Sequence, residues 1–437
     1  MVMRPQKHGW CETVVISSSE SRWDERGINS GEDTMLATFF ILTTLLELGS
    51  AQVETKKLSE ADFVSAKGCG KCHQQIYSQW SQSMHSQSAT DPLYRAVIDE
   101  MIRQTGGQRR DFCLSCHFPV ASSTGRIRQI PAPLDWQSFS GIENEGVTCD
   151  FCHTISGKEN LGKNISVGAY VYPHVGTTAV KYGRDADAQS SYHRTEVSSF
   201  LTSAELCAVC HKFQHPVMGT EVQDTYREWL KSPQSRQGIR CQDCHMSAYA
   251  GTTAVGGKER KDIHAHVFTG GHSEMVKKAA TITVSGKVES GKEGQQLTVM
   301  GKVSNSGAGH LIPTGIPGIR EMWLEVEVLG PGGQVLEQKR FAYGQKLVTR
   351  DGTAALPWEA YKVVEDTRIE PQKSREYIFR TPLPQQVNGS LEIRSRLYDR
   401  LISESMSHRL NMPVQDRILM ASADATVPVD TSKAPKP

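Results

Sequence analysis

The sequence lacks an excess of charge of either sign. Its 49 Lys and Arg residues and 48 Asp and Glu residues leave a formal net charge of +1 at pH 7. No run of like charges forms an acidic or basic tail. Binding to the phosphate backbone of a nucleic acid depends on concentrated positive charge. The composition therefore gives no indication of a nucleic-acid partner.

Long apolar segments are also missing. The stretch from Leu36 to Leu46 is apolar but too short to span a bilayer comfortably. It is typical of the apolar core of a signal peptide, and Gly49 to Ala51 supply the small residues of a cleavage site, although the residues just before the stretch are acidic. We predict that translation begins at Met35 and that residues 1–51 are a dispensable leader plus signal peptide. The alternative is an uncleaved membrane anchor.

Cysteines available for disulfide bonds are almost absent, because ten of the eleven lie in five copies of one pattern, Cys-x-x-Cys-His. Random placement of 11 Cys and 15 His residues in this chain would give only ~0.01 copies of the pattern. The copies comprise Cys69, Cys72 and His73; Cys113, Cys116 and His117; Cys149, Cys152 and His153; Cys207, Cys210 and His211; and Cys241, Cys244 and His245.

This pattern is typical of covalent c-type haem attachment. Two thiols on one tight turn add to the two vinyl groups of a haem, and the adjacent imidazole reaches the iron as its proximal ligand. Paired cysteines also build zinc sites, but zinc would not explain a histidine after all five pairs. We therefore predict five covalently bound c-type haems. Because haem is joined to polypeptides outside the bacterial or archaeal cytoplasm, we expect an exported protein, either periplasmic or at the cell exterior.

The spacing of the motifs predicts one shared haem domain. A chain of 437 residues has room for two or three domains. Successive copies begin 44, 36, 58 and 34 residues apart, which is too irregular for a solenoid repeat and too little chain to enclose each haem separately. Haems packed against one another would also explain the modest hydrophobic fraction of 38%. We predict an α-rich, irregular multihaem cytochrome c domain with a haem-built core over residues 60–275.

Short helices and loops are the expected local structure of this domain. Gln74–Ser88 and Asp91–Gln104 have helical character, whereas Gly157–Gly183 is rich in Gly, Val and Tyr and predicts a loop with a strand pair.

Each iron has a second axial position, and nine further histidines could fill these positions. His85 lies twelve residues after His73, which on a helix is ~18 Å, so it can serve only a neighbouring haem. His215 shares a helical face with His211 and is a poor ligand for the same haem. The candidates are His85, His174, His193, His215, His264, His266, His272, His310 and His408.

Some of these histidines are expected to have no ligand role. A lone loop histidine is ordinarily a solvated side chain, and we expect this of His408 and of one of His264 and His266. Methionine is the competing sixth ligand. Because nine spare histidines are available, we predict predominantly bis-histidine haems.

The first motif and its surroundings resemble a known family. Cys69 to His85, with Trp80, is similar to the opening haem motif of the cytochrome c-554 group, multihaem cytochromes related to hydroxylamine oxidoreductase. The segments Thr225–Trp229, Cys241–Met246 and His266–His272 also resemble this group, so that the resemblance covers about residues 65–275. It implies that His85 and His266 are distal ligands and that His193 is a third.

From Thr281 the pattern changes to strict alternation of apolar and polar residues. Leu297–Val303, Leu324–Val328, Val335–Leu336, Tyr377–Arg380 and Leu391–Leu397 each place an apolar face on a strand. Six or seven strands are typical of a β-sandwich, so we predict an all-β, sandwich-like domain over residues 280–420 with a structural or docking role. The Pro-, Ser- and Ala-rich residues 421–437 are predicted to be disordered.

His310 lies inside this β-rich region, in a segment from Gly307 to Gly315. It resembles a Gly-His-x-x-Pro-Thr-Gly segment that accompanies multihaem cytochromes, and the resemblance implies a ligand role. Flanking glycines would let the backbone approach a flat macrocycle, and Pro313 would stiffen the turn. The alternative is a turn histidine at the domain surface.

Three functions agree with these features. We favour an electron carrier without catalytic residues, which exchanges electrons with other cytochromes or with quinol-linked membrane complexes. The second hypothesis is an oxidoreductase acting on a small nitrogen or sulfur compound, such as nitrite or hydroxylamine, at one haem with an open position. No motif has the Cys-x-x-Cys-Lys form of ammonia-forming nitrite reductases. The third is a homo-oligomer or subunit of an extracellular cytochrome filament.

Overall fold

The computed structural model describes residues 57–108, 110–158, 170–172, 180–214, 221–292, 294–385 and 387–429. Residues Lys56–Pro437 belong to one compact unit. The predicted leader and signal peptide, together with His174 and His215, lie outside the described residues. Within the described ranges, no helix combines the length and the apolar character needed to cross a membrane.

The haem-motif region is built from short helices. Each of the last four Cys-x-x-Cys-His copies lies within or at the end of one helix, and the first begins where α1 ends. The helices are α1 (Ala66–Cys69), α2 (Gln74–Ser81), α3 (Met84–Gln87), α4 (Pro92–Thr105), α5 (Arg110–His117), α6 (Pro119–Ser123), α7 (Cys149–His153), α8 (Glu205–His211), α9 (Thr225–Leu230), α10 (Pro233–Arg236) and α11 (Cys241–His245). Single-turn 3₁₀ helices are η1 (Glu60–Asp62), η2 (Arg126–Arg128), η3 (Trp136–Ser138), η4 (Glu143–Glu145) and η6 (Glu274–Lys278).

Capping residues explain where these helices begin. The side chain of Asp91 accepts a hydrogen bond from the backbone of Tyr94, and Pro92 occupies the first turn of α4. The helix predicted over Gln74–Ser88 is instead divided into α2 and α3, because Ser83 caps a new helix while its hydroxyl bonds to Trp80. The break turns the chain just before His85.

Paired strands are short in this region. They are β1 (Gly157–Lys158) with β2 (Tyr170–Val171), β3 (Val180–Gly183) with β4 (Arg194–Val197), β5 (Phe213–Gln214) with β6 (Glu221–Gln223), and β7 (Ala248–Thr252) with β8 (Glu259–His264). The predicted strand pair within Gly157–Gly183 therefore exists as β1 and β2.

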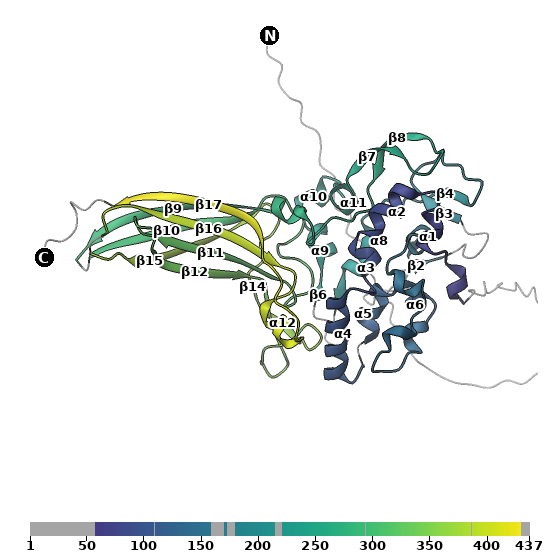
Figure 1. The fold of residues 1–437 in the computed structure, drawn as a ribbon, viewed down its shortest axis with the longest axis horizontal. Helices are drawn as coiled ribbons and strands as arrows, with labels where there is room; N and C mark the ends of the chain where they lie inside the picture. Colours follow the sequence, from purple (N-terminus) through teal and green to yellow (C-terminus); the bar gives the residue numbers. More distant parts are fainter. Residues whose placement is uncertain are drawn as a thin grey trace, which may run out of the picture. The chain divides into compact units, whose positions relative to one another are not determined.

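The C-terminal region consists of two antiparallel sheets. Sheet order is β15-β10-β9 in one and β12-β11-β16-β17 in the other, with a separate hairpin of β13 and β14. Figure 1 shows the long strands lying alongside one another. Their bounds are β9 (Ala280–Gly291), β10 (Gly294–Asn305), β11 (Glu321–Leu329), β12 (Val335–Tyr343), β13 (Gln345–Val348), β14 (Lys362–Asp366), β15 (Ser374–Pro382), β16 (Gly389–Arg400) and β17 (Ile418–Val429), with α12 (Glu404–Arg409) between the last two.

One apolar core is shared by both sheets. Leu297 and Val299 of β10 contribute to it from one sheet, and Val326 of β11 and Leu391 of β16 from the other. At Gly286 a Cβ atom would lie 2.5 Å from the side chain of Ile393, so only glycine allows the two strands to approach this closely.

The prediction of a disordered tail from residue 421 is wrong for residues 421–429. These residues form most of β17 and pair with β16. Between Ala421 and Val429 the odd-numbered positions are Ala or Val and are buried or half-buried, whereas the even-numbered positions are exposed. Composition suggested disorder, but the alternation with period two specifies a strand.

The haem-motif region also has apolar side-chain clusters of its own, in addition to the haem-built core predicted from the sequence. One contains Phe63, Val120, Phe151, Ile155 and Tyr170. A larger one contains Ile98, Met101, Leu114 and Phe118, and it continues into the C-terminal region through Trp358, Ile402 and Met406. The second cluster therefore joins α4 to α12 and to the loop before β14.

Trp358 provides a test of this shared cluster. Its side chain is buried, and its indole N–H donates to the side chain of Gln104 over 2.8 Å. Trp358→Ala is expected to reduce the free energy of unfolding by about 3–5 kcal/mol, because it removes a large buried side chain. Denaturant unfolding would measure the loss. The control Tyr361→Ala, at a 41% exposed position, should change stability by less than about 1 kcal/mol.

Candidate haem-binding site

Four of the five motif histidines face a second histidine across a similar gap. We number the sites 1 to 5 after the motifs in chain order. The ring-centroid distances and interplanar angles are 6.3 Å and 27° for His73 with His193 at site 1, 6.2 Å and 23° for His153 with His266 at site 3, 6.4 Å and 49° for His211 with His85 at site 4, and 6.3 Å and 16° for His245 with His310 at site 5.

This spacing fits two imidazoles bound to one metal ion. Two metal–nitrogen bonds of roughly 2.0–2.1 Å, each extended by about 1.1 Å to the ring centre, place the centroids roughly 6.2–6.4 Å apart. Rings in direct van der Waals contact would lie closer together. Each pair therefore leaves room for one iron and the porphyrin plane between the two rings.

Hydrogen bonds fix most of these rings in the orientation that a ligand requires. Where Nδ1 donates to a carbonyl oxygen, Nε2 is the nitrogen free to bind iron. The carbonyl partners are Thr253 for His73 (2.8 Å), Ser88 for His117 (2.9 Å), Tyr182 for His153 (2.7 Å), Arg194 for His193 (3.1 Å), His264 for His266 (2.9 Å), Leu311 for His310 (2.9 Å), and Thr269 for His245. The two rings of site 4 differ, because the buried Nδ1 of His85 has no partner among the described residues and Nδ1 of His211 lies 3.4 Å from the side-chain amide nitrogen of Gln223.

Burial keeps the central rings neutral, as iron ligation requires. Removal from water lowers the pKa of His85 to about 3 and the pKa values of His211, His266 and His310 to about 4. Neighbouring histidines lower the pKa of His85 further, since His211, His117, His266 and His245 all lie near it. His85 is thus at the centre of the histidine array.

The motif cysteines of different sites lie side by side. Hydrogen bonds between thiols connect Cys69 with Cys149, Cys116 with Cys210, and Cys207 with Cys241. In each case the bond lowers the pKa of one thiol and raises that of the other. Thioether bonds at these positions would bring the edges of haems 1 and 3, 2 and 4, and 4 and 5 together.

Site 2 lacks a facing histidine among the described residues. The ring of His117 instead stacks on Tyr94, with centroids 3.7 Å apart and planes within 5°. Tyr94 is half-buried, and its hydroxyl, which is itself buried, has no hydrogen-bond partner in the described part of the chain. The sequence patterns gave no sign of a role for Tyr94, which lies in the first turn of α4 and outside every haem motif.

The remaining candidate histidines have other surroundings. Burial lowers the pKa of His272, and the positive charge of Arg320 lowers it further. No motif histidine faces His272 in the described ranges. His264 bonds through Nδ1 to the carbonyl of Met246, and His408 is exposed beside Glu404. The ligand roles of His85, His193, His266 and His310 fit the geometry. That of His174 falls outside the described residues.

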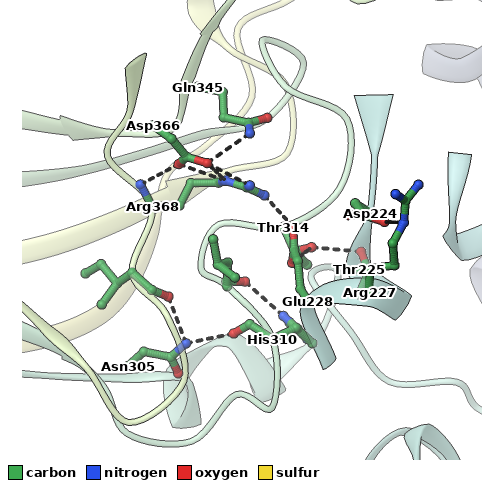
Figure 2. A network of polar contacts seen from close by, with 12 residues as sticks. Asp224, Thr225, Arg227, Glu228, Asn305, His310, Thr314, Gln345, Asp366 and Arg368 are labelled. Carbon is green, nitrogen blue, oxygen red and sulfur yellow. Dashed lines mark hydrogen bonds and ion pairs between the residues drawn. The ribbon is translucent and has the colours of Figure 1, made fainter. Parts of the chain in front are cut away.

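The loop that carries His310 is held by a polar network (Figure 2). The amide of Asn305 donates to the carbonyl oxygens of His310 (2.7 Å) and Ile369 (3.0 Å). The hydroxyl of Thr314 donates to Glu228 of α9 over 2.8 Å. Gly307 lies where the loop passes close to the backbone of Lys278, since a Cβ atom at Gly307 would lie 2.0 Å from the carbonyl oxygen of Lys278.

Comparisons with known proteins agree with these observations. Residues 68–154 match the family described as cytochrome c554 and c-prime. None of the curated proteins matches the chain. A solved structure of a penta-haem cytochrome c552 from Thermochromatium tepidum is similar, with a TM-score of 0.63 and 23% identity over 84% of this chain and 100% of that chain.

A second solved structure, a putative β-galactosidase from Bacteroides fragilis, matches with a TM-score of 0.20 and 12% identity over 35% of this chain and 18% of that chain, and this likeness is too low to carry an argument. Together, the five motifs, the family match over residues 68–154 and the fold likeness support a multihaem c-type cytochrome with a β-rich C-terminal region.

Proposed function

We propose that this chain carries electrons through five covalently attached c-type haems, four of them with two histidine ligands. The observation that carries this proposal is the set of four histidine pairs at 6.2–6.4 Å. Bound haem iron supplies the one-electron redox chemistry. The chain's own residues hold the ligand rings, exclude water from the central sites and bring neighbouring attachment points together.

The contacts between cysteines suggest the order of the haems. Site 1 adjoins site 3 through Cys69 and Cys149, and site 4 adjoins both site 2 and site 5. Cys152 of site 3 is near enough to Cys210 of site 4 to raise the pKa of its thiol. We infer a chain of closely spaced haems from site 1 through sites 3 and 4 to site 5, with site 2 beside site 4.

We place electron exchange with redox partner proteins at site 1. Its two histidines, His73 and His193, are half-exposed, and exposed apolar side chains lie beside them. Tyr192, beside His193, is 85% exposed, and Val255, whose backbone N–H bonds to Cys72, is 66% exposed. Apolar side chains beside an accessible redox centre suit the small contact surfaces of transient electron-transfer complexes.

A count of haems and spin states tests the electron-carrier proposal. Mass spectrometry of the mature protein should give five covalent haems, and EPR of the oxidised protein should show four low-spin haems and at most one high-spin haem. Four or fewer haems in folded protein, or two or more high-spin haems, would contradict it.

A second candidate function rests on site 2. Because His117 faces Tyr94 and no second histidine in the described ranges, haem 2 has an open position in this proposal. Reduction or oxidation of a small nitrogen or sulfur compound could take place there. Turnover of nitrite or hydroxylamine, with a shift of the high-spin signal on addition of that compound, would support the enzyme. An unchanged high-spin signal and no turnover would rule out this enzyme activity and favour the electron-carrier function.

We further propose that the mature protein is exported to the periplasm or cell exterior, because c-type haem attachment takes place outside the cytoplasm. The two C-terminal sheets with their common core are proposed to form a sandwich-like domain that supplies His310 to site 5. N-terminal sequencing of the mature protein tests the export proposal, since residues before Met35 would contradict the predicted start.

A further inference from the structure

The peptide group between His310 and Leu311 is held from two directions. On one side, its carbonyl oxygen accepts a hydrogen bond from Asn305, which is fully buried at the end of β10. On the other side, its N–H lies near the carboxylate of Glu228 in α9, to which Thr314 of the same loop donates a hydrogen bond over 2.8 Å. The carbonyl of Leu311 accepts from Nδ1 of His310 over 2.9 Å. Leu311 therefore lies between the buried carboxylate and the imidazole ring.

Glu228 is itself fixed by partners from both regions of the chain. Thr314 donates to its Oε2 over 2.8 Å, and Thr225 shares a hydrogen bond of 2.7 Å with the same hydroxyl. Arg368 donates to Oε1 of Glu228. The side chain of Arg368 is only 12% exposed and that of Glu228 only 5%. A buried carboxylate with this many partners has little freedom to move.

Arg368 is in turn anchored within the C-terminal region, as Figure 2 shows. Its Nε donates to Asp366 over 3.0 Å, and its Nη2 donates to the second carboxylate oxygen over 2.9 Å. Gln345 donates to Asp366 over 2.9 Å. The network therefore runs from β13 and β14 through Arg368 and Glu228 to Thr314, in the same loop as His310 and Leu311.

We propose that Glu228 is a positioning residue for haem 5, which sets the plane of the His310 ring relative to that of His245. This inference rests on the proposed ligand role of His310. The two planes lie within 16° of each other, whereas the planes of His85 and His211 differ by 49°. His85, whose Nδ1 has no partner among the described residues, shows that burial alone does not align a ring pair in this chain.

The angle between axial imidazole planes has a spectroscopic signature. Near-parallel planes give a rhombic low-spin EPR signal, and planes that approach perpendicular give a more anisotropic one. Site 5 should therefore contribute one of the most rhombic signals in the wild-type spectrum. Loss of this signal in His310→Ala identifies which component belongs to haem 5.

Glu228→Ala removes the acceptor for the hydroxyl of Thr314, which holds the loop of His310 against α9. The haem-5 signal is expected to broaden and to move toward greater anisotropy, while the covalent haem count stays the same. Glu228→Gln keeps an acceptor oxygen and should restore the wild-type line shape in large part. The matched control is Glu100→Ala, because Glu100 is also a buried glutamate at the junction, paired with Arg103 and Arg409, and it should leave the haem-5 signal unchanged.

The outcomes separate the two proposals. If His310→Ala does not change any low-spin signal, the ligand assignment fails. If His310→Ala removes a signal that Glu228→Ala leaves unchanged in position and width, the positioning role alone is overturned. Should Glu228→Ala give no folded protein, Thr314→Val replaces it, since it removes one donor to the same carboxylate. A smaller displacement of the same signal is then expected, and an unaltered signal counts against the proposal.

Discussion

His310→Ala is expected to convert one haem from low spin to high spin. Without the imidazole opposite His245, the iron at site 5 loses a strong nitrogen donor, and its reduction potential should rise by on the order of 0.1 V, within the roughly 0.8 V over which axial ligands tune haem. EPR and potentiometric titration would measure the two changes. No other haem should respond to the same extent.

The substitution should also loosen the contact between the two regions of the chain. The loop of His310 would keep its bonds to Asn305 and, through Thr314, to Glu228, and the apolar cluster around Trp358 would remain, so we expect a folded protein with earlier proteolysis at the junction. His408→Ala is the matched control, because this exposed histidine of α12 faces no motif histidine among the described residues. An unchanged low-spin count in folded His310→Ala protein would rule out the ligand role.

Cys149→Ser is expected to disrupt folding as well as redox function. Cys149 lies between the buried residues Thr148 and Asp150, and its thiol contacts Cys69 of site 1. A misplaced haem 3 would leave a cavity larger than any side chain, and large-to-small core substitutions already cost about 2–5 kcal/mol. We expect a loss of at least about 5 kcal/mol, a lower yield of soluble protein and fewer than five haems by mass spectrometry.

The exposed spacer residue of another motif provides the comparison for this variant. Lys71 lies between Cys69 and Cys72 and is exposed, so Lys71→Ala should retain the full haem count and nearly full stability. Wild-type stability and haem content in Cys149→Ser would show that the haem at site 3 is not part of the core.

Several features could be predicted from the sequence because they depend on neighbours along the chain. The five attachment motifs are one example, since two thiols and an imidazole must lie within five residues to bind one haem. The alternation in Leu297–Val303 and Leu391–Leu397 is another, and it specified β10 and β16. The same alternation in Ala421–Val429 would have predicted β17 had it been given more weight than composition.

Other features depend on contacts that sequence spacing does not encode. The helix expected over Gln74–Ser88 was broken by the capping bonds of Ser83, which compete locally with helix continuation. The stacking of Tyr94 on His117 gave no sequence signal, because stacking at a proximal ligand requires no motif. The cluster that joins Ile98 to Trp358 likewise unites residues from opposite parts of the chain.

The sequence by itself predicted which residues attach haem, pointed to a multihaem c-type cytochrome, and specified a C-terminal region rich in strands. Only the tertiary structure decided which histidines face each other, since His85, His193, His266 and His310 each reach their partner across 65 to 126 residues of chain. The physical reason is that covalent attachment is a local reaction, whereas an axial pair forms only where packing brings two distant rings to opposite sides of one iron.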